Sequence, residues 1–111
     1  MKTIEINGEK YVKLNEADSS YVVVRTKNAG VHAGYLKNRE DAEVTLTNTR
    51  RLWYWKGAAS LSQIAGAGIS KPDECKFPEA IDSILLTEVI ELIPCTTEAK
   101  DIIQGVAPWV A

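Results

Sequence analysis

Alternation of hydrophobic and polar positions predicts a chain built mainly from β-strands. Residues 3–6 alternate, Asn7 and Gly8 interrupt, and residues 9–14 alternate again. Asn-Gly between two alternating runs is a strong hairpin signal, because a type I′ turn needs positive φ at both central positions. We therefore expect an N-terminal hairpin over residues 3–14.

The same pattern predicts further strands in the first half of the chain. They are separated by short turns and cover residues 21–26, 31–36, 42–46 and 50–55. The first is rich in valine, which indicates burial on at least one face. The polar or glycine-containing breaks between these strands fall at residues 28–30, 38–41 and 47–49.

Two helices are expected, each with recognisable ends. Gly57 to Ser60 predicts a turn that opens a short central helix, and Gly66 to Gly68 ends it, since glycine is common just past a helix C-terminus. Near the C-terminus, Thr96 and Thr97 are suitable caps for a helix over residues 98–104.

Residues 81–94 admit two interpretations. Their apolar positions fit a helix face moderately well, whereas their isoleucine and valine content and the stop at Pro94 favour one or two strands. We choose strands. The expected fold class is therefore α+β: a small, mostly antiparallel β-sheet domain with one short central helix and one C-terminal helix.

Length, composition and charge narrow the functional classes. A chain of 111 residues supports a single domain over residues 1–111, and 45% hydrophobic with 25% charged residues is ordinary globular composition. A net charge of -2 gives no long-range attraction to a nucleic acid polymer or an anionic membrane, so any anion site must be local. No apolar run or signal peptide indicates a membrane or secreted protein, and we expect a cytoplasmic one.

The sequence contains no recognised pattern for catalysis or metal binding. Cys75 and Cys95 are far apart with only His32 to assist them, so free thiols are the simpler expectation and no metal site is predicted. Nucleophile-elbow, Walker A, zinc-protease and complete dinucleotide-binding motifs do not occur. We therefore expect no catalytic residues, no cofactor and no enzymatic activity.

The stretch from Arg50 to Ala65 is the best candidate for a binding site. On a strand, Trp53 and Trp55 would share one face, where a nucleotide base could stack. Arg50 or Arg51 could pair with phosphate. The alternative is that both tryptophans belong to the core, as alternating aromatic residues in strands usually do.

Small residues and two further side chains complete the candidate set. Gly57 would permit close approach of a ligand, and backbone amides around Ala58 and Ser60 could donate to an anion at the helix start. His32 lies between two glycines and is either a ligand contact or a strand histidine whose ring is satisfied locally. Arg25 is a further candidate cation for phosphate.

From residue 21 to about residue 109, the chain resembles a family of short bacteriophage and prophage proteins catalogued under a domain of unknown function. The segments that carry the resemblance are YVVVRT at 21–26, AGVHAG at 29–34, residues 50–65, CKF at 75–77 and LTEVIE at 86–91. The resemblance implies a phage setting, but it brings no activity and no assigned site.

Small non-enzymatic phage proteins often bind a host protein or sequester a nucleotide signal used in antiviral defence. We therefore expect a phage-encoded sponge in the host cytoplasm that binds a small nucleotide-like ligand, of the cyclic nucleotide or cyclic ADP-ribose type. The alternative is a protein-interaction module that inhibits a host factor through its aromatic strand. Edge strands and an apolar C-terminal strand further predict a homo-oligomer.

Overall fold

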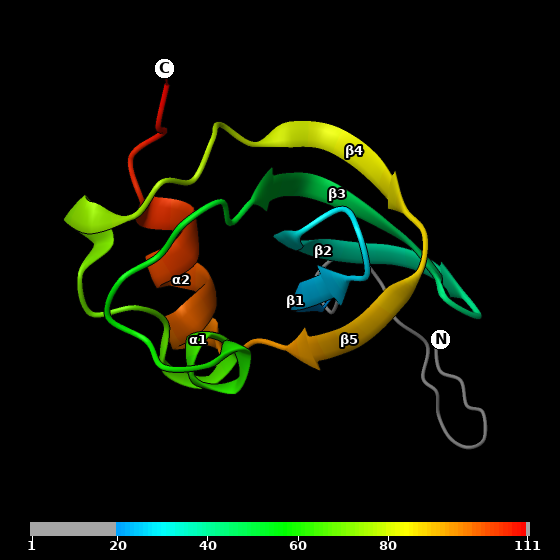
Figure 1. Ribbon diagram of the computed structural model, residues 1–111, viewed down its shortest axis with the longest axis horizontal. Helices are drawn as coiled ribbons and strands as arrows, with labels where there is room; N and C mark the ends of the chain where they lie inside the picture. The colour runs from blue at the N-terminus through cyan, green and yellow to red at the C-terminus, as the bar shows by residue number, and fades with distance from the viewer. Residues whose placement is uncertain (1–19, 111) are drawn as a thin grey trace.

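The computed structural model describes residues 20–110, which form one antiparallel β-sheet with two helices at one end (Figure 1). The strands are β1 (Tyr21–Thr26), β2 (Val31–Glu40), β3 (Glu43–Arg51), β4 (Ile81–Leu86) and β5 (Val89–Pro94). The helices are α1 (Leu61–Ala67) and α2 (Thr97–Gly105), with a short 3₁₀ helix, η3 (Pro72–Glu74), between α1 and β4. The predicted α+β class is confirmed, and the hairpin predicted over residues 3–14 lies outside the described residues.

Chain connectivity forces the sheet to curl. The strand order is β4-β3-β2-β1-β5, so β4 and β5 occupy opposite edges although only Thr87 and Glu88 join them. Five flat strands would hold the edges roughly 19 Å apart, whereas the three peptide units from Leu86 to Val89 reach at most about 11 Å. The sheet therefore bends into a partly open barrel, in which β4 continues around into β5 (Figure 1).

Both faces of β1 are buried, in two separate cores. Tyr21 and Val23 face the helices, whereas Val22 and Val24 face the barrel interior. The helix-side core also contains Leu61, Ile64, Phe77 and Ile103. The barrel core also contains Val44, Leu46 and Leu86. The predicted burial of this strand is confirmed, and it places the side chain of Tyr21 at the junction between the sheet and the helices.

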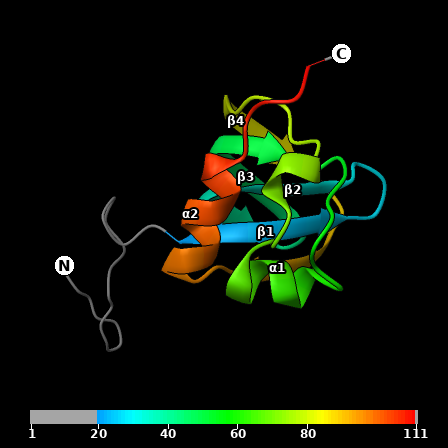
Figure 2. The same ribbon diagram turned by 90° about the vertical axis from the view of Figure 1, so that its left-hand side faces the viewer.

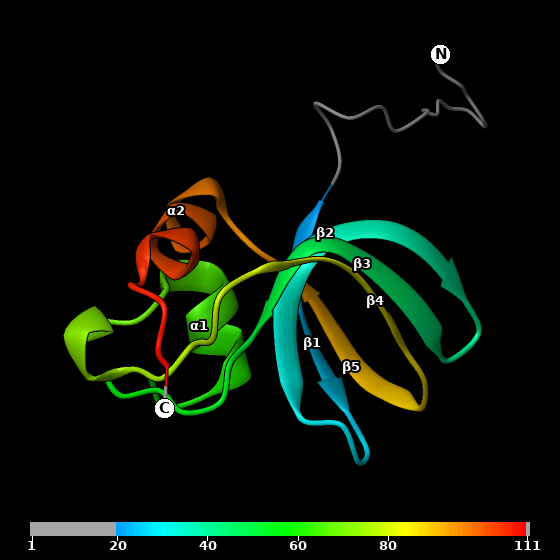
Figure 3. The same ribbon diagram turned by 90° about the horizontal axis from the view of Figure 1, so that it is seen from above.

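The helices pack together at one end of the barrel, as Figures 2 and 3 show. The Ser60 side chain caps α1 by accepting a hydrogen bond from the Gln63 N–H, and Thr96 caps α2 by accepting one from the Ala99 N–H. The Thr96 hydroxyl also donates to the Gly66 carbonyl at 2.9 Å, which ties the two helices together. No helix within residues 20–110 is long and apolar enough to cross a membrane.

The other local predictions hold in part. Residues 81–94 form two strands, as chosen over the helix. The turn predicted at residues 38–41 is shorter, because β2 continues to Glu40 and Asp41 turns with a φ of 54°. The break predicted at residues 47–49 is absent: Asn48 adopts a φ of 45°, and β3 shifts register against β2 and continues. In both places cross-strand pairing overrides the local preference of polar residues for turns.

The strand predicted over residues 50–55 is wrong beyond Arg51, where β3 ends. The partner strand β2 begins at Val31, whose carbonyl accepts the Leu52 N–H at 2.8 Å. No earlier residue of β2 remains to pair with the next residues, so the ladder stops there.

The chain after β3 turns to a different partner. The N–H groups of Trp53 and Tyr54 approach the Lys76 carbonyl at 3.2 and 3.3 Å, and the Lys76 N–H donates to the Tyr54 carbonyl at 2.7 Å. This isolated bridge does not form a strand, so Trp53 and Trp55 do not share a strand face as predicted.

Candidate functional site

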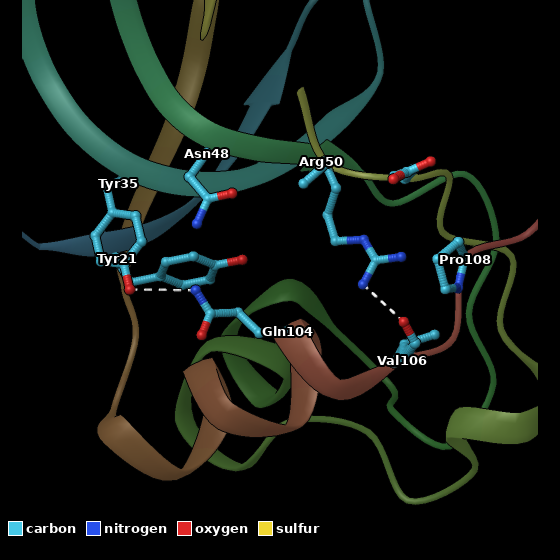
Figure 4. Close-up of a pocket in the computed structure, with 9 residues that line it drawn as sticks. Tyr21, Tyr35, Asn48, Arg50, Gln104, Val106 and Pro108 are labelled. Carbon is cyan, nitrogen blue, oxygen red and sulfur yellow. Dashed lines mark hydrogen bonds between the residues drawn. The ribbon is translucent and has the colours of Figure 1, made fainter. Parts of the chain in front are cut away.

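A pocket of about 390 Å³ opens between β3, α2 and the segment before β4 (Figure 4). This volume is near the lower end of the range of about 300–1,000 Å³ that is usual for small-molecule sites. The polar and aromatic lining comes from distant parts of the chain: Tyr21, Tyr35, Asn48, Arg50, Glu79 and Gln104.

Arg50 forms one wall of the pocket and holds the surrounding segments in place. Its side chain is buried, and Nε donates to the Pro78 carbonyl at 3.0 Å while Nη2 donates to the Phe77 carbonyl at 2.8 Å. Nη1 donates to the carbonyls of Ile103 and Val106 at 3.1 and 2.8 Å. A guanidinium has five N–H donors, so these bonds leave one N–H on Nη2 for another acceptor.

The charge of Arg50 has no close counter-ion in the described part of the chain. The ion pairs found there join Arg25 to Glu91 and Lys56 to Glu74. Burial lowers the pKa of Arg50, while the nearby Tyr21 and Glu79 act in the opposite direction. A buried cation that is bonded only to neutral carbonyls favours the approach of an anion.

Tyr21 adds a hydroxyl to the same wall. Its side chain is only 4% exposed, its ring packs edge-on against Tyr35 with centroids 5.1 Å apart, and its hydroxyl points into the pocket towards Arg50 (Figure 4). Burial raises the pKa of Tyr21, with a smaller contribution from Cys95, so the hydroxyl is a neutral donor at pH 7. No residue between 20 and 110 hydrogen-bonds this hydroxyl, and a buried polar group without a partner is costly.

Two side-chain amides lie on the rim. Asn48 points its amide into the pocket, and Gln104 reaches across from α2 to donate to the Tyr35 hydroxyl at 3.2 Å (Figure 4). Asn48, at the register shift of β3, and Arg50, two residues further along, both line the pocket. Each amide offers both donors and an acceptor, so the rim can match a ligand edge that carries both kinds of group.

A second hollow of about 270 Å³ brings together three of the predicted site residues, His32, Arg50 and Arg51. The Arg51 guanidinium also lies over the Trp53 ring, 5.3 Å from its centroid. The His32 ring is buried, and its Nε2 lies 2.9 Å from the Ala29 carbonyl oxygen. Burial lowers the pKa of His32, more than that hydrogen bond raises it, so the ring is neutral at pH 7.

Gly57 has a positive φ of 97°, and the close approach predicted there for a ligand comes instead from the chain itself. A Cβ on Gly57 would lie 2.6 Å from the Ser70 Oγ and 2.7 Å from the Lys71 backbone nitrogen. Its lack of a side chain is therefore needed for packing against residues 70–71.

The start of α1 also uses its polar groups internally. Ser60 is the N-cap, and the Ala59 N–H donates to the Gln63 side-chain oxygen at 2.9 Å. Ala58 is half-buried against the helix-side core. Of the backbone amides predicted to bind an anion at this turn, the Ala59 N–H is therefore already used within the fold.

The remaining predicted residues lie apart from the pocket. Trp53 is 57% exposed, whereas Trp55 is half-buried and packs against the helix-side core. Arg25 pairs with Glu91 at 3.2 Å on the exposed surface of β1 and β5. The two tryptophans thus have different environments, one on the surface and one at the border of the core.

Sequence reasoning found Arg50 but missed its pocket neighbours Tyr21, Asn48, Glu79 and Gln104. The one local signal was the polar break at residues 47–49 within a strand pattern, which marks Asn48. The other residues meet only through the packing of α2 and the segment before β4 against the sheet. Within residues 20–110, no three metal-ligating side chains gather.

The chain belongs to the family described as a domain of unknown function (DUF6948), which its sequence matches over residues 19–103. The matched range includes Tyr21, Asn48 and Arg50. No curated protein and no solved structure is significantly similar to the chain.

Proposed function

We propose that this protein binds a small, planar, anionic ligand in the Arg50 pocket without transforming it, and that the ligand is derived from a nucleotide. The observation that carries the proposal is the buried Arg50 guanidinium, which forms no ion pair within residues 20–110 and shares its wall with the Tyr21 hydroxyl, which hydrogen-bonds to no residue of that range. A phosphate or carboxylate oxygen between them would accept the remaining Nη2 N–H and the Tyr21 O–H, both strong donors to an anion.

The rest of the lining suits a nucleobase. The Tyr35 ring offers an aromatic surface, and base–aromatic contacts are worth about 1–3 kcal/mol. Asn48 and Gln104 present amide donors and acceptors at the rim, which can pair with the mixed edge of a base. The lining thus supplies contacts for both a base and an anionic group.

The volume limits the size of the ligand. A pocket of about 390 Å³ suits a single nucleotide unit. A cyclic dinucleotide would extend beyond one chain's pocket. Among the expected ligands, the size therefore favours a cyclic mononucleotide, with a larger cyclic ADP-ribose reaching out over the rim.

Binding without conversion would make the protein a sponge for an antiviral signal if it acts, as we propose, as a phage protein in the host cytoplasm. Two features support binding over catalysis. Glu79 is the single carboxylate among the described lining residues, and none of those residues is a histidine. Hydrolysis of a nucleotide normally requires a general acid and a general base, and these described lining residues do not include an evident pair of them.

The test is a panel of mononucleotides, cyclic nucleotides and cyclic ADP-ribose isomers. Each is incubated with the protein, unbound material is removed, and bound material is released by heating and identified by mass spectrometry. Recovery of an intact compound supports the proposal. A chemically altered compound would indicate an enzyme, and retention of no compound would contradict ligand binding.

A matched pair of variants locates the site. Tyr21→Phe keeps the packed ring and removes the hydroxyl, so affinity should fall about tenfold, equivalent to roughly 1.4 kcal/mol. Tyr54→Phe removes the hydroxyl of an exposed tyrosine outside the pocket and should leave affinity unchanged. Equal affinities for Tyr21→Phe and the parent would place the ligand elsewhere.

Exposed aromatic side chains favour a second candidate, inhibition of a host protein. Trp53, Tyr54 and Trp109 are 57%, 46% and 37% exposed. The Lys76 ammonium lies 5.8 Å from the Tyr54 ring centroid and 5.6 Å from that of Trp109. Such residues dominate many protein interfaces. In this case Trp53→Ala should abolish capture of the host protein and leave nucleotide binding intact.

A further inference from the structure

The two edges of the curled sheet differ in how they are protected against pairing with another chain. The β5 edge has a register shift at Arg25 and Thr26, carries the Arg25–Glu91 ion pair and ends in Pro94. Bulges, charges and proline all discourage edge-to-edge association. The β4 edge has none of these except one acid, Asp82.

The exposed side of β4 is apolar at both ends. Ile84 and Leu86 belong to the barrel core, so the alternation of the strand turns Ile81, Ser83 and Leu85 outwards. Ile81 is 52% exposed and Leu85 is 59% exposed, and Ser83 lies between them. Within residues 20–110 no strand pairs with the outer edge of β4, and an exposed apolar strand with such an edge is a site for pairing.

We propose that β4 pairs in antiparallel fashion with β4 of a second copy, about a twofold axis at Ser83. In this register Ser83 faces its own copy, and Ile81 faces Leu85 of the partner subunit, twice by symmetry. A symmetric interface must be self-complementary in this way, and apolar cross-strand pairs stabilise a sheet.

Neighbouring registers fit less well. An axis at Asp82 sets two carboxylates directly opposite each other, which is unfavourable. An axis at Ile84 sets Leu85 against serine and leaves Ile81 opposite Thr87. Sliding one β4 strand along the other by an odd number of residues would place side chains that face outwards opposite side chains that face the barrel core. Only the axis at Ser83 pairs both apolar ends and keeps the acids apart.

The same register has a consequence for the pocket. Glu79 precedes β4 and lines the pocket, and the pairing sets it opposite the β4–β5 turn of the partner subunit. The second copy would therefore border the pocket rim. The pairing itself rests on the β4 edge and does not depend on a ligand.

Light scattering after size-exclusion chromatography tests the association. The protein at high micromolar concentration should have twice the mass of the 12.2 kDa chain. Leu85→Lys should give a folded monomer, because its side chain is exposed. The matched control Ile90→Lys changes a residue that is 61% exposed on β5 and should remain a dimer. A monomeric parent, or a dimeric Leu85→Lys, would overturn the proposal.

Disulfide cross-linking tests the register. Ser83→Cys should form a covalent dimer on mild oxidation, because the two residues meet at the axis. The control Asp82→Cys should cross-link much less, and the parent, with its free Cys75 and Cys95, should remain uncross-linked. Preferential cross-linking of Asp82→Cys would contradict the axis at Ser83.

Discussion

Replacing Arg50 with alanine should destabilise the fold far more than a change at its exposed neighbour Arg51. The substitution removes four N–H donors from the carbonyls of Phe77, Pro78, Ile103 and Val106. Those carbonyls belong to the end of α2 and to the segment that precedes β4. Arg50 is therefore a link between the sheet and both segments.

The expected loss is about 3–5 kcal/mol. Each hydrogen bond from a charged donor is worth roughly 1.5–3 kcal/mol. Two effects reduce the sum: water from the pocket can reach some of the freed carbonyls, and removing a buried charge recovers its desolvation cost. The remainder is still a large share of a typical stability of about 5–15 kcal/mol.

Arg50→Lys should recover part of this loss. An ammonium keeps the charge and offers three donors, but they radiate from one atom and cannot reach four separated carbonyls. Its free energy of unfolding should lie between those of the parent and Arg50→Ala.

Urea unfolding followed by tryptophan fluorescence measures these differences. Arg51→Ala is the matched control, and its exposed side chain should contribute less than about 0.5 kcal/mol. An Arg50→Ala variant within about 0.5 kcal/mol of the parent would refute the structural role assigned to Arg50.

Three further outcomes follow from local geometry. Gly57→Ala should lower the free energy of unfolding by about 1–3 kcal/mol, because of the positive φ at this position and the clash of a Cβ with residues 70–71. Gly66→Ala has open space around it in α1 and should raise the free energy of unfolding by about 0.5–1 kcal/mol in the same urea titration. Burial lowers the pKa of His32 below 6.5, so its contribution to stability is complete above pH 6.5 and declines as the pH falls towards the folded pKa; His32→Gln should flatten that part of a stability–pH curve. Burial raises the pKa of Cys95 to about 11 and Cys75 is buried, so both thiols should react with Ellman's reagent at pH 8 much more slowly in the native protein than in guanidinium chloride.

Local sequence signals predicted the parts of the fold that depend on local physics. The valine-rich first strand, the start of α1 after residues 57–60, the cap at Thr96, and the strands within residues 81–94 all appear as expected. Each is decided by side-chain propensity or by a hydrogen bond to a residue three positions away. The curl of the sheet could not be predicted from such local signals, because it depends on the order in which the strands pair.

The candidate site was less predictable for the same reason. Trp53 has strong strand propensity, but the strand stops because β2 has no earlier residue to pair with it. The pocket joins Tyr21, Asn48 and Gln104, which are far apart in sequence. Arg50 was chosen for its charge, yet its burial and its four carbonyl partners are visible only in the folded structure.

The most direct test of the proposed pocket is a titration of ¹⁵N-labelled protein with the nucleotide panel, followed by NMR. Adenosine 5′-monophosphate and its 3′,5′-cyclic form are the first probes. A ligand in the pocket should shift the side-chain NH₂ signals of Asn48 and Gln104 in a saturable way, while the indole N–H signals of Trp53 and Trp55 stay in place. Saturable shifts of those indoles, with the Asn48 and Gln104 signals unmoved, would contradict the account.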